Sequence, residues 1–437
     1  MNCNSPGAEK PTGQRLHYKK QDNFFNLLFK LPYFPSSAHR LYNDSCGGGG
    51  GKRKRKTMKT TNRTMRKIIR IILFALTFSA GACTTDKQTE TSVCEFSFTE
   101  TDVDVSGLYS KARYVKLEQP NKDAIISNIG RILFVPERIA VVDQDGNKVL
   151  LFDEKGNFIK STSSRIGNGH NEYIRLSDCA ADVDNGLFYL CCDAPYQILV
   201  LDKDLNFVER IQMDCFFNEM VISGEHAYAT VHVYEPTDCY ELRRYDKRNF
   251  KLPYKVLATK ENTENGVMGF GKQLCSDGET VYAAMPMDNN IFTIKNGEIE
   301  EQTELDFGER WFAQGNATHA SGRAFIEQNQ EKIWTIQNIC ASDSILLFNT
   351  NKSGIYHLNK KTMSGIAYRW STNDNSLYGN SWMTPCCGLK NTTVKIIPSN
   401  FVVRLQKDST LTRTLPEVLK GIKEGDSNLI LEIRNIL

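Results

Sequence analysis

The sequence of Gly130–Tyr173 is GRILFVPERIAVVDQDGNKVLLFDEKGNFIKSTSSRIGNGHNEY, and it contains three short strand-like runs. Two segments that each contain Gly-Asn separate these runs, and Gly-Asn readily adopts the positive φ of a tight hairpin. Three consecutive strands without room for a crossover helix must pair antiparallel. The stretch therefore predicts a meander of strands at Arg138–Val142, Lys148–Phe152 and Phe158–Ser163. One such sheet cannot bury both of its faces, so the remaining chain must supply further sheets.

The same three-strand unit recurs along the chain. The residue that opens the turn after the middle strand is Asp153, Asp202, Asp246, Lys295 and then Asn359, at spacings of 49, 44, 49 and 64 residues. A period of this length with several short strands in each unit is typical of a β-propeller. We therefore predict an all-β fold, a six-bladed β-propeller of four-stranded antiparallel blades, over residues 108–437.

The sixth unit and the closure of the ring are less regular. Three runs can form the sixth unit, namely Tyr378–Met383, Thr393–Ile397 and Phe401–Leu405. Either Tyr114–Leu117 or the late run Leu429–Ile433 can add the missing strand, and pairing the two ends of the chain avoids an exposed sheet edge. We expect a short C-terminal helix at Leu415–Lys423.

Charge divides the chain of 437 residues into two parts. The whole chain has a net charge of +3, but residues 1–82 carry +13 and the remaining residues −10. Phosphate binding needs clustered positive charge. The acidic body therefore argues against nucleic acid as a partner, and the basic leader is excluded from the fold.

The leader has the pattern of an export signal. Met58 and Met65 are more natural initiators than Met1, so we expect residues 1–57 to be disordered or to precede the true start. Residues 58–82 are predicted to be a signal peptide, because a basic end precedes the uncharged run Ile71–Ala82. The 12 residues of that run fall well short of the roughly 20 that span a bilayer.

The residues that follow this run resemble the lipobox of bacterial lipoproteins, in which a cysteine is acylated. The match is Ala80-Gly81-Ala82-Cys83, with Ala80 where Leu is commonest. We predict lipidation of Cys83 and a polar tether over residues 83–107, with ordinary cleavage after Ala82 as the alternative. The expected location is the cell envelope, as an outer-membrane lipoprotein that faces the periplasm or the cell surface and contacts the membrane only through its lipid anchor.

Ten of the thirteen cysteines lie in the body after Cys83, with no CxxC and no Cys/His spacing typical of zinc. Export permits disulfides, but the adjacent pairs Cys191-Cys192 and Cys386-Cys387 do not easily bridge each other. Cysteines in apolar runs behave as small hydrophobic residues. We therefore expect most of these cysteines to be free and buried, including Cys179, Cys191, Cys215, Cys275 and Cys340.

Three segments of the body are longer than a tight turn: Lys260–Lys272, Glu309–Glu331 and Ser371–Lys390. Long loops on a rigid ring often carry binding residues, and flexible surface insertions are the alternative. The second segment contains His319 and Arg323, which we count as possible ligand-binding residues.

The phrase Arg165–Tyr173, RIGNGHNEY, resembles the blade motif of the six-bladed β-propeller lipoproteins of Gram-negative gut anaerobes, which are relatives of NHL-repeat propellers. That motif usually reads IG-x-G-P-G-E-Y, and His170-Asn171 replaces its Pro-Gly pair here. The resemblance covers roughly residues 110–437 and implies the propeller fold far more than any activity. Further matches are Arg113–Leu117, Ser127–Ile132 and Asn428–Ile433.

The blade-motif residues have a structural interpretation. The glycines let the chain turn towards the next blade, and Glu172 and Tyr173 can fix that crossing through hydrogen bonds to the backbone or to Arg165. The motif residues are Arg165, Gly167, Gly169, Glu172 and Tyr173. His170 is either a ligand contact or a solvated loop histidine.

Motifs for catalysis, cofactors and metals are weak. Asp143–Asn147 faintly resembles a calcium loop, but its glycine is misplaced and a hairpin turn is the better interpretation. His226 and His232 lie six residues apart, hence on one face of a strand, where they either line a metal site or pack. No nucleophile elbow, H-E-x-x-H, P-loop or dinucleotide motif occurs. We assign no catalytic residue, no metal and no cofactor.

The sequence favours a binding or scaffold module at the cell envelope, with an unknown protein, peptide or glycan as ligand and the long-loop end of the ring axis as the site. The first alternative is a propeller enzyme, a lyase or hydrolase of glycans or peptides, that brings His226, His232 and His319 together at the axis. The second alternative is a protein partner of an outer-membrane uptake system.

Overall fold

The computed structural model describes residues 89–99, 101–105, 107–233, 239–259, 271–312, 322–352, 354–369, 371–372, 383–407 and 415–437. The predicted signal peptide and Cys83 lie outside these residues. Within them, no helix is both long enough and apolar enough to span a bilayer.

The stretch Gly130–Tyr173 contains the meander that its sequence predicts. Its four antiparallel strands are β4 (Ile129–Val135), β5 (Arg138–Asp143), β6 (Lys148–Asp153) and β7 (Phe158–Ser161). Asn147 has a φ of 54° and Gly156 a φ of 88°, so each Gly-Asn turn contains a residue with positive φ. Turn chemistry therefore fixes where the strands reverse.

Four further groups of four consecutive strands repeat this order, and the last two groups belong to one nine-stranded sheet. They consist of β8 (Arg175–Asp182), β9 (Leu187–Ala194), β10 (Tyr196–Asp202) and β11 (Phe207–Gln212); of β12 (Glu219–Ser223), β13 (His226–Val233), β14 (Cys239–Asp246) and β15 (Tyr254–Ala258); of β16 (Leu274–Ser276), β17 (Thr280–Ala284), β18 (Asn290–Lys295) and β19 (Glu298–Asp306); and of β20 (Ile336–Ala341), β21 (Ile345–Thr350), β22 (Ile355–Asn359) and β23 (Ser364–Tyr368).

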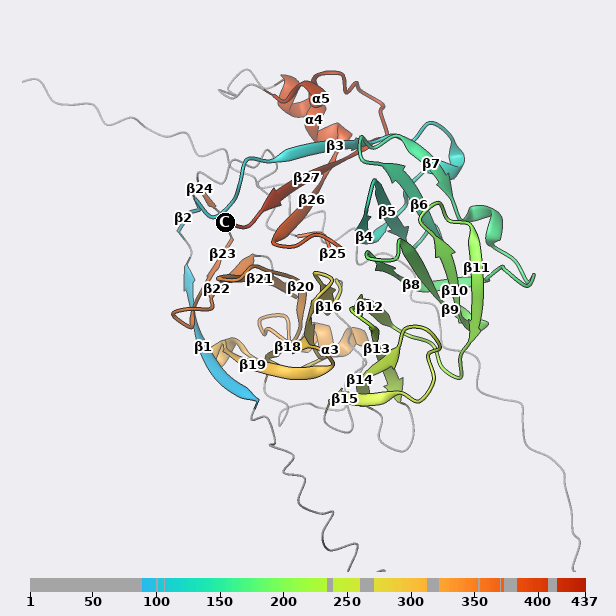
Figure 1. Cartoon of the computed structure of the whole chain (residues 1–437). Coiled ribbons are helices and arrows are strands. Elements are labelled where there is room, and N and C mark those ends of the chain that lie inside the picture. The colour runs from blue at the N-terminus through green and yellow to red at the C-terminus, as the bar shows by residue number, and fades with distance from the viewer. Residues whose placement is uncertain are drawn as a thin grey trace, which may run out of the picture. The chain divides into compact units, whose positions relative to one another are not determined.

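The five groups of strands surround a common axis, with the first strand of each group nearest the axis (Figure 1). This is the arrangement of a β-propeller, as the repeat predicts. We call the groups that begin with β4, β8, β12, β16 and β20 blades 1 to 5.

A further sheet joins the two ends of the body. It consists of β26 (Thr392–Pro398), β27 (Leu429–Asn435) and β3 (Arg113–Leu117), all antiparallel. Leu431 of β27 pairs with Val115 of β3, so the late strand and the early strand lie side by side. The predicted closure by Tyr114–Leu117 and Leu429–Ile433 is confirmed, and it uses both runs rather than one.

The expected sixth unit needs a correction at Phe401–Leu405, which is helical. This run lies in α4 (Ser399–Lys407), whose buried residues include Ser399, Val402 and Val403. Their spacing of three and four residues places them on one helix face. That face packs against Leu419, Ile422 and Ile430. Residues 378–382 lie outside the described part of the chain.

Short elements complete the described chain. The predicted helix at Leu415–Lys423 contains α5 (Glu417–Lys420). In the second long segment, α3 covers Gly322–Gln328. The remaining elements are β2 (Val103–Asp104), which pairs with β24 (Ser371–Thr372), β25 (Cys386–Cys387), which pairs with β4, and three 3₁₀ turns at Lys122–Ala124, Ser163–Arg165 and Gly308–Arg310.

Most of the predicted tether that falls in the described residues is a strand. β1 (Glu90–Thr99) lies between β19 and β23 and pairs in parallel with both, so it joins the outer edges of blades 4 and 5. Cys94 is fully buried, and Phe96 and Phe98 follow on the same face at a period of two. This alternation makes residues 90–99 a strand, which corrects the expectation of a polar tether through residue 107.

Phe96 anchors β1 to an aromatic cluster. Its ring centroid lies 5.2 Å from that of Phe307, 5.6 Å from that of Phe348 and 5.9 Å from that of Tyr356. A Cβ atom on Gly365 would lie 2.6 Å from the Phe96 ring, so only glycine leaves room for the ring at that position. The strand is thus held by packing as well as by backbone pairing.

We expect Phe96→Ala to lower the free energy of unfolding by about 3 kcal/mol, because truncation of a packed aromatic ring leaves a cavity. Val93→Ala is the matched control on the same strand, since Val93 is 54% exposed, and we expect a change of no more than about 0.5 kcal/mol. Urea titration of the purified protein measures both values. Equal effects of the two changes would contradict the anchoring role of Phe96.

Candidate functional site

Charged residues from four blades meet at the ring axis. Arg131 of β4 is fully buried and donates from Nη1 to Asp178 Oδ2 of β8 at 2.8 Å. Its Nη2 lies 3.5 Å from Glu219 Oε2 of β12. Lys272, which precedes β16, lies with its Nζ 3.2 Å from Asp178 Oδ1. Two cations and two carboxylates thus neutralise one another in the interior; we call these four residues the axial charge cluster.

Backbone groups complete the cluster. Arg131 also donates to the carbonyl oxygens of Met220 at 2.6 Å and of Leu274 at 3.2 Å. Asp178 accepts from the Met220 amide, and Glu219 accepts from the amides of Gln273 and Leu274. Buried charges need such partners because desolvation is costly. The cluster therefore joins the inner strands of blades 1 to 4.

The pKa values in the cluster reflect this balance. Burial alone would lower the pKa of Arg131, but Asp178 and Glu219 raise it above its ordinary value, so the guanidinium stays charged. Burial raises the pKa of Glu219, while Lys272 and Arg131 act in the opposite direction. A carboxyl with these contacts serves the fold, because its lone pairs are already directed at backbone amides and cations.

Neutral polar side chains continue the ring towards blade 5. Asn338 accepts at Oδ1 from the Lys272 amide at 3.1 Å and donates from Nδ2 to the Met383 carbonyl at 2.9 Å. Gln337 accepts from the Gly271 amide at 2.9 Å. These amides connect blades 4 and 5 with the segment that leads to β25. Among the described residues, hydrogen bonds therefore continue from the axial charge cluster to blade 5.

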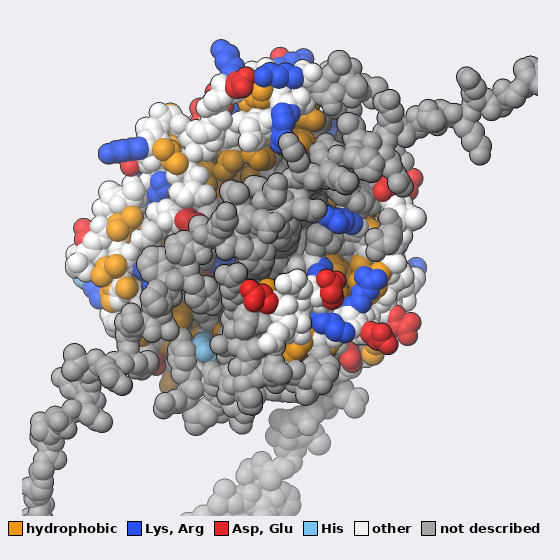
Figure 2. Space-filling view, turned by 180° about the vertical axis from the view of Figure 1, so that it is seen from behind, with side chains coloured by type: hydrophobic (Ala, Val, Ile, Leu, Met, Phe, Trp, Pro, Cys, Tyr) orange, Lys and Arg blue, Asp and Glu red, His pale blue; other side chains and the backbone are white. Residues whose placement is uncertain are grey.

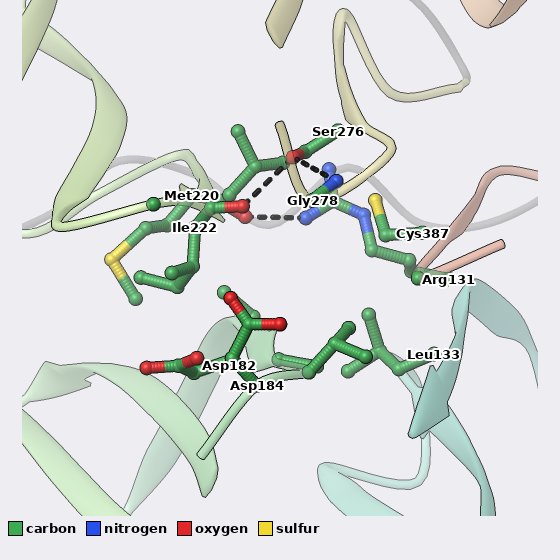
Figure 3. A pocket seen from close by; sticks show the side chains of 15 residues that line it. Arg131, Leu133, Asp182, Asp184, Met220, Ile222, Ser276, Gly278 and Cys387 are labelled. Atoms are coloured by element: carbon green, nitrogen blue, oxygen red, sulfur yellow. Dashed lines mark hydrogen bonds between the residues drawn. The ribbon is translucent and has the colours of Figure 1, made fainter. Parts of the chain in front are cut away.

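One cavity opens beside the axial charge cluster, and its lining is shown in Figure 3. It is narrow, with a volume of about 20 Å³, and continues into solvent. Asp182 on its wall is paired with Lys247 at 2.7 Å, and the Ser276 hydroxyl donates to the Ile222 carbonyl at 2.8 Å. Cys387 also lines it, beside Arg131. Most polar groups of the wall already have partners, so the cavity has few donors or acceptors to offer a substrate.

The blade motif forms a closed loop between blades 1 and 2. Tyr173 is fully buried; its hydroxyl lies 2.7 Å from Thr162 Oγ1 and donates to the Asn147 carbonyl at 3.0 Å. The Tyr173 amide donates to the Arg165 carbonyl, and the Gly167 amide donates to the Tyr173 carbonyl. These contacts tie the crossing segment to the last strand and a turn of blade 1.

Glu172 and Arg165 support the same loop from its exposed side. Glu172 Oε2 accepts from the Gly169 amide at 2.7 Å, and a Cβ atom on Gly167 would lie 2.2 Å from that oxygen. Arg165 donates to the Leu205 carbonyl of blade 2 at 3.3 Å. His170 is exposed, and its ring packs edge-on against Phe207 at 5.9 Å between centroids. His170 thus caps the outer strand of blade 2.

A shallow groove lies where this loop meets blade 2. It has a volume of about 320 Å³ and is lined by Asn168, Gly169, Glu172, Ile174, Ala194, Pro195 and Arg210. Ile174 is 49% exposed and Tyr196, which follows Pro195, is 43% exposed. The Tyr196 ring packs against that of Phe216, with 6.0 Å between centroids and an angle of 39° between the ring planes. We call these lining residues together with Tyr196 and Phe216 the blade 2 groove.

The predicted histidine candidates do not form one site. His226 and His232 lie at opposite ends of β13, the second strand of blade 3, so about 20 Å separates them along the strand. His232 stacks on Tyr240 at 4.5 Å, and burial lowers the pKa of His226. His319 lies outside the described residues, and Arg323 lies in α3 where only the backbone is described.

Metal ligation finds no support in the described residues, which contain no group of three or more histidine, cysteine or acidic side chains able to hold an ion. Asp143, the first residue of the suspected calcium loop, accepts instead from the amides of Ser127, Asn128 and Gly146. The hairpin interpretation of Asp143–Asn147 is therefore correct.

Sequence reasoning missed the axial charge cluster. The signal was present, because Arg131 and Asp178 interrupt otherwise apolar strands and Glu219 begins one. An isolated charge in an apolar strand indicates a buried partner. Nothing in the spacing of these residues shows that they face one another, since their proximity follows from the closure of the ring.

Comparisons with known proteins support this fold and assign no activity. A family model described as "Domain of unknown function (DUF4934)" matches residues 94–433. No curated protein matches the chain. A solved structure from Bacteroides fragilis, described as an exported protein, is 17% identical over 79% of this chain and 100% of its own, with a TM-score of 0.62.

Other solved propellers are more distant. The β-propeller domain of Cps50 from Myceliophteria thermophila is 13% identical, covering 55% of this chain and 68% of its own, with a TM-score of 0.34. The WD40 β-propeller domain of Doa1 is 11% identical, covering 58% and 71%, with a TM-score of 0.32.

We expect Arg131→Met to destabilise the protein by about 3–5 kcal/mol, because it leaves two buried carboxylates facing one remaining cation. Arg138→Met is the control: Arg138 pairs with the partly exposed Asp204 at 2.8 Å, and such a pair contributes about 1 kcal/mol or less. Chemical unfolding followed by tryptophan fluorescence measures both. A loss for Arg131→Met no larger than for the control would show that the axial charge cluster does not hold the blades.

Proposed function

The chain belongs to the family described as domain of unknown function (DUF4934), and we propose that it is an exported, lipid-anchored, six-bladed β-propeller that acts as a binding module for a protein at the cell envelope. In this proposal β26, β27 and β3 form the sixth blade. Export is supported by the predicted signal peptide and by the likeness to an exported protein. The phrase at Arg165–Tyr173 resembles the motif of propeller lipoproteins, which supports the anchor at Cys83.

The observation that supports a binding function is that the charged groups at the axis interact with one another and leave no acid, base or nucleophile for a substrate among the described residues. Arg131, Asp178, Glu219 and Lys272 direct their charges at one another and at backbone groups. A catalytic site needs acid, base or nucleophilic groups that converge on a place a substrate can occupy. The described residues of the axis hold no such convergence, so we assign function to the outer surface of the ring.

The blade 2 groove has the composition of a protein contact surface. Aromatic residues and arginine are enriched in interfaces, and Tyr196, Phe216 and Arg210 lie here with the exposed Ile174. Small-molecule sites enclose most of their ligand, whereas this groove is shallow and lies on the rim. An extended segment or a loop of a protein partner therefore fits it better than a small ligand.

The described part of the face in Figure 2 carries basic and acidic side chains interspersed with apolar ones. Nucleic-acid binding needs a continuous basic surface. This mixture instead matches protein recognition, in which complementary charges fix orientation and exposed apolar side chains contribute affinity.

The anchor is tested by incorporation of radiolabelled palmitate in a Gram-negative host. We expect Cys83→Ala to abolish labelling and to release the protein from the membrane fraction. Cys215→Ala is the control, because Cys215 lies in the folded body and only part of it is exposed, and it should label normally. Normal labelling of Cys83→Ala would refute the anchor.

The contact surface is tested by a photo-crosslinking amino acid at Tyr196 in whole cells. We expect this probe to give a discrete adduct with an envelope protein, which mass spectrometry identifies. The matched control places the probe at Lys203, which is partly exposed in the turn at the other end of β10. The double change Ile174→Asp and Arg210→Glu should reduce the Tyr196 adduct at least tenfold. Adducts of equal yield from both positions, or an adduct unaffected by the double change, would contradict the groove as a binding surface.

A further inference from the structure

Four cysteines gather beside the ring axis, although they are far apart in the sequence. Cys386 and Cys387 form β25, which lies beside β4, while Cys275 belongs to β16 and Cys340 to β20. Successive side chains of a strand point to opposite faces. The two adjacent cysteines therefore face different neighbours rather than each other.

Each adjacent cysteine meets one distant thiol. Cys275 lies against β25, because its Sγ donates to the Cys386 carbonyl oxygen at 3.5 Å, which brings it beside Cys387. Cys386 packs in the same apolar cluster as Cys340. Cys387 belongs to a second cluster, and Cys275 packs against a third. The fold thus sorts four thiols into two pairs, each of which joins β25 to a different blade.

We propose that these pairs oxidise to two disulfides, Cys275–Cys387 and Cys340–Cys386, and that the bridges fasten β25 to blades 4 and 5; the oxidising compartment that this requires rests on the proposed export. β25 lies in the segment between blade 5 and β26, where the ring closes. The bridges would hold this segment, which pairs with β4 through only two residues.

The chemistry is thiol–disulfide exchange with an oxidised dithiol oxidase of the envelope or with a small-molecule disulfide. A thiolate attacks the oxidant's disulfide and forms a mixed disulfide, and the partner thiolate then displaces the oxidant. Formation of each bridge removes two protons and two electrons from two cysteine thiols, and the oxidant's disulfide is reduced to two thiols. Two rounds form both bridges.

Cys387 is suited to the first attack. It lines the axial cavity and is 8% exposed, so the cavity wall must open before a small disulfide reaches it. The contact with the Cys275 thiol lowers the pKa of Cys387, and the positive charge of Arg131 acts in the same direction. The thiolate is the reactive form. The axial charge cluster therefore supports the reactivity of the neighbouring thiol.

The test uses the purified body, residues 84–437, treated with oxidised glutathione while folded. Thiols are then blocked under denaturing conditions and counted by mass. Ten cysteines are free in the reduced chain, and two bridges should leave six. A non-reduced tryptic digest should join three peptides, because Cys386 and Cys387 share one peptide that carries both bridges. We also expect the thermal midpoint of the oxidised protein to fall by several degrees on reduction.

Single variants identify the pairs. Cys275→Ser should free Cys387 alone and leave Cys340–Cys386 intact, whereas Cys191→Ser, a buried cysteine elsewhere, should leave both bridges. A Cys386–Cys387 bridge, or ten free thiols after oxidation of the folded protein, would overturn the proposal. These measurements need no export, so they are separate from the test of the anchor. Bridges that form in the tube in a protein that fractionates with the cytoplasm would contradict the proposed location and leave the pairing intact.

Discussion

The burial of Arg131 is the constraint on which the arrangement of the blades depends. A guanidinium at zero exposure must find carboxylates and carbonyls on every side, because the cost of an unpaired buried charge is several kcal/mol. Its partners are Asp178, Glu219 and the carbonyls of Met220 and Leu274, which belong to the three following blades. Apolar packing alone would tolerate small rotations between blades. The directional contacts of Arg131 do not, so they select one arrangement around the axis.

The second constraint is closure of the ring, because the first and last sheets would otherwise leave unpaired edge strands. The structure closes in two ways. β27 pairs with β3, which unites the end of the chain with its beginning, and β1 inserts between blades 4 and 5 with parallel pairing on both sides. Both joints use strands from outside the regular repeat. Near this closure lies β25, whose two residues pair with β4, and the thiol pairs lie there.

Local sequence patterns predict most of the strands. They do not predict which residues from different blades contact one another across the ring. Turn chemistry and alternation placed β5 to β7 and the closing strands, because those signals depend on neighbours in sequence. The polar residues Thr84–Ser92 predict a tether, although Cys94, Phe96 and Phe98 just after them alternate as a strand does. The run at Phe401–Leu405 is apolar enough for either structure, and only the surface that covers Val402 and Val403 decides for a helix. The axial charge cluster and the cysteine pairs join residues 46 to 112 positions apart, so no spacing in the sequence reveals them.

The polar groups of the interior already have partners within the protein, so the interior gives little information about a ligand. The exposed residues of the surface give more. The charged and amide side chains at the axis bind one another and so hold the blades together. Tyr173 and Glu172 of the blade motif make hydrogen bonds within the segment that crosses between blades 1 and 2. A ring built in this way leaves its turns free to vary without loss of the fold. The blade 2 groove lies beside the motif, where one side of the loop is fixed by Glu172 and the other presents Ile174 to solvent. A rigid loop that exposes apolar surface loses little entropy on binding, so the residues that make the joint also make the surface that a partner would meet.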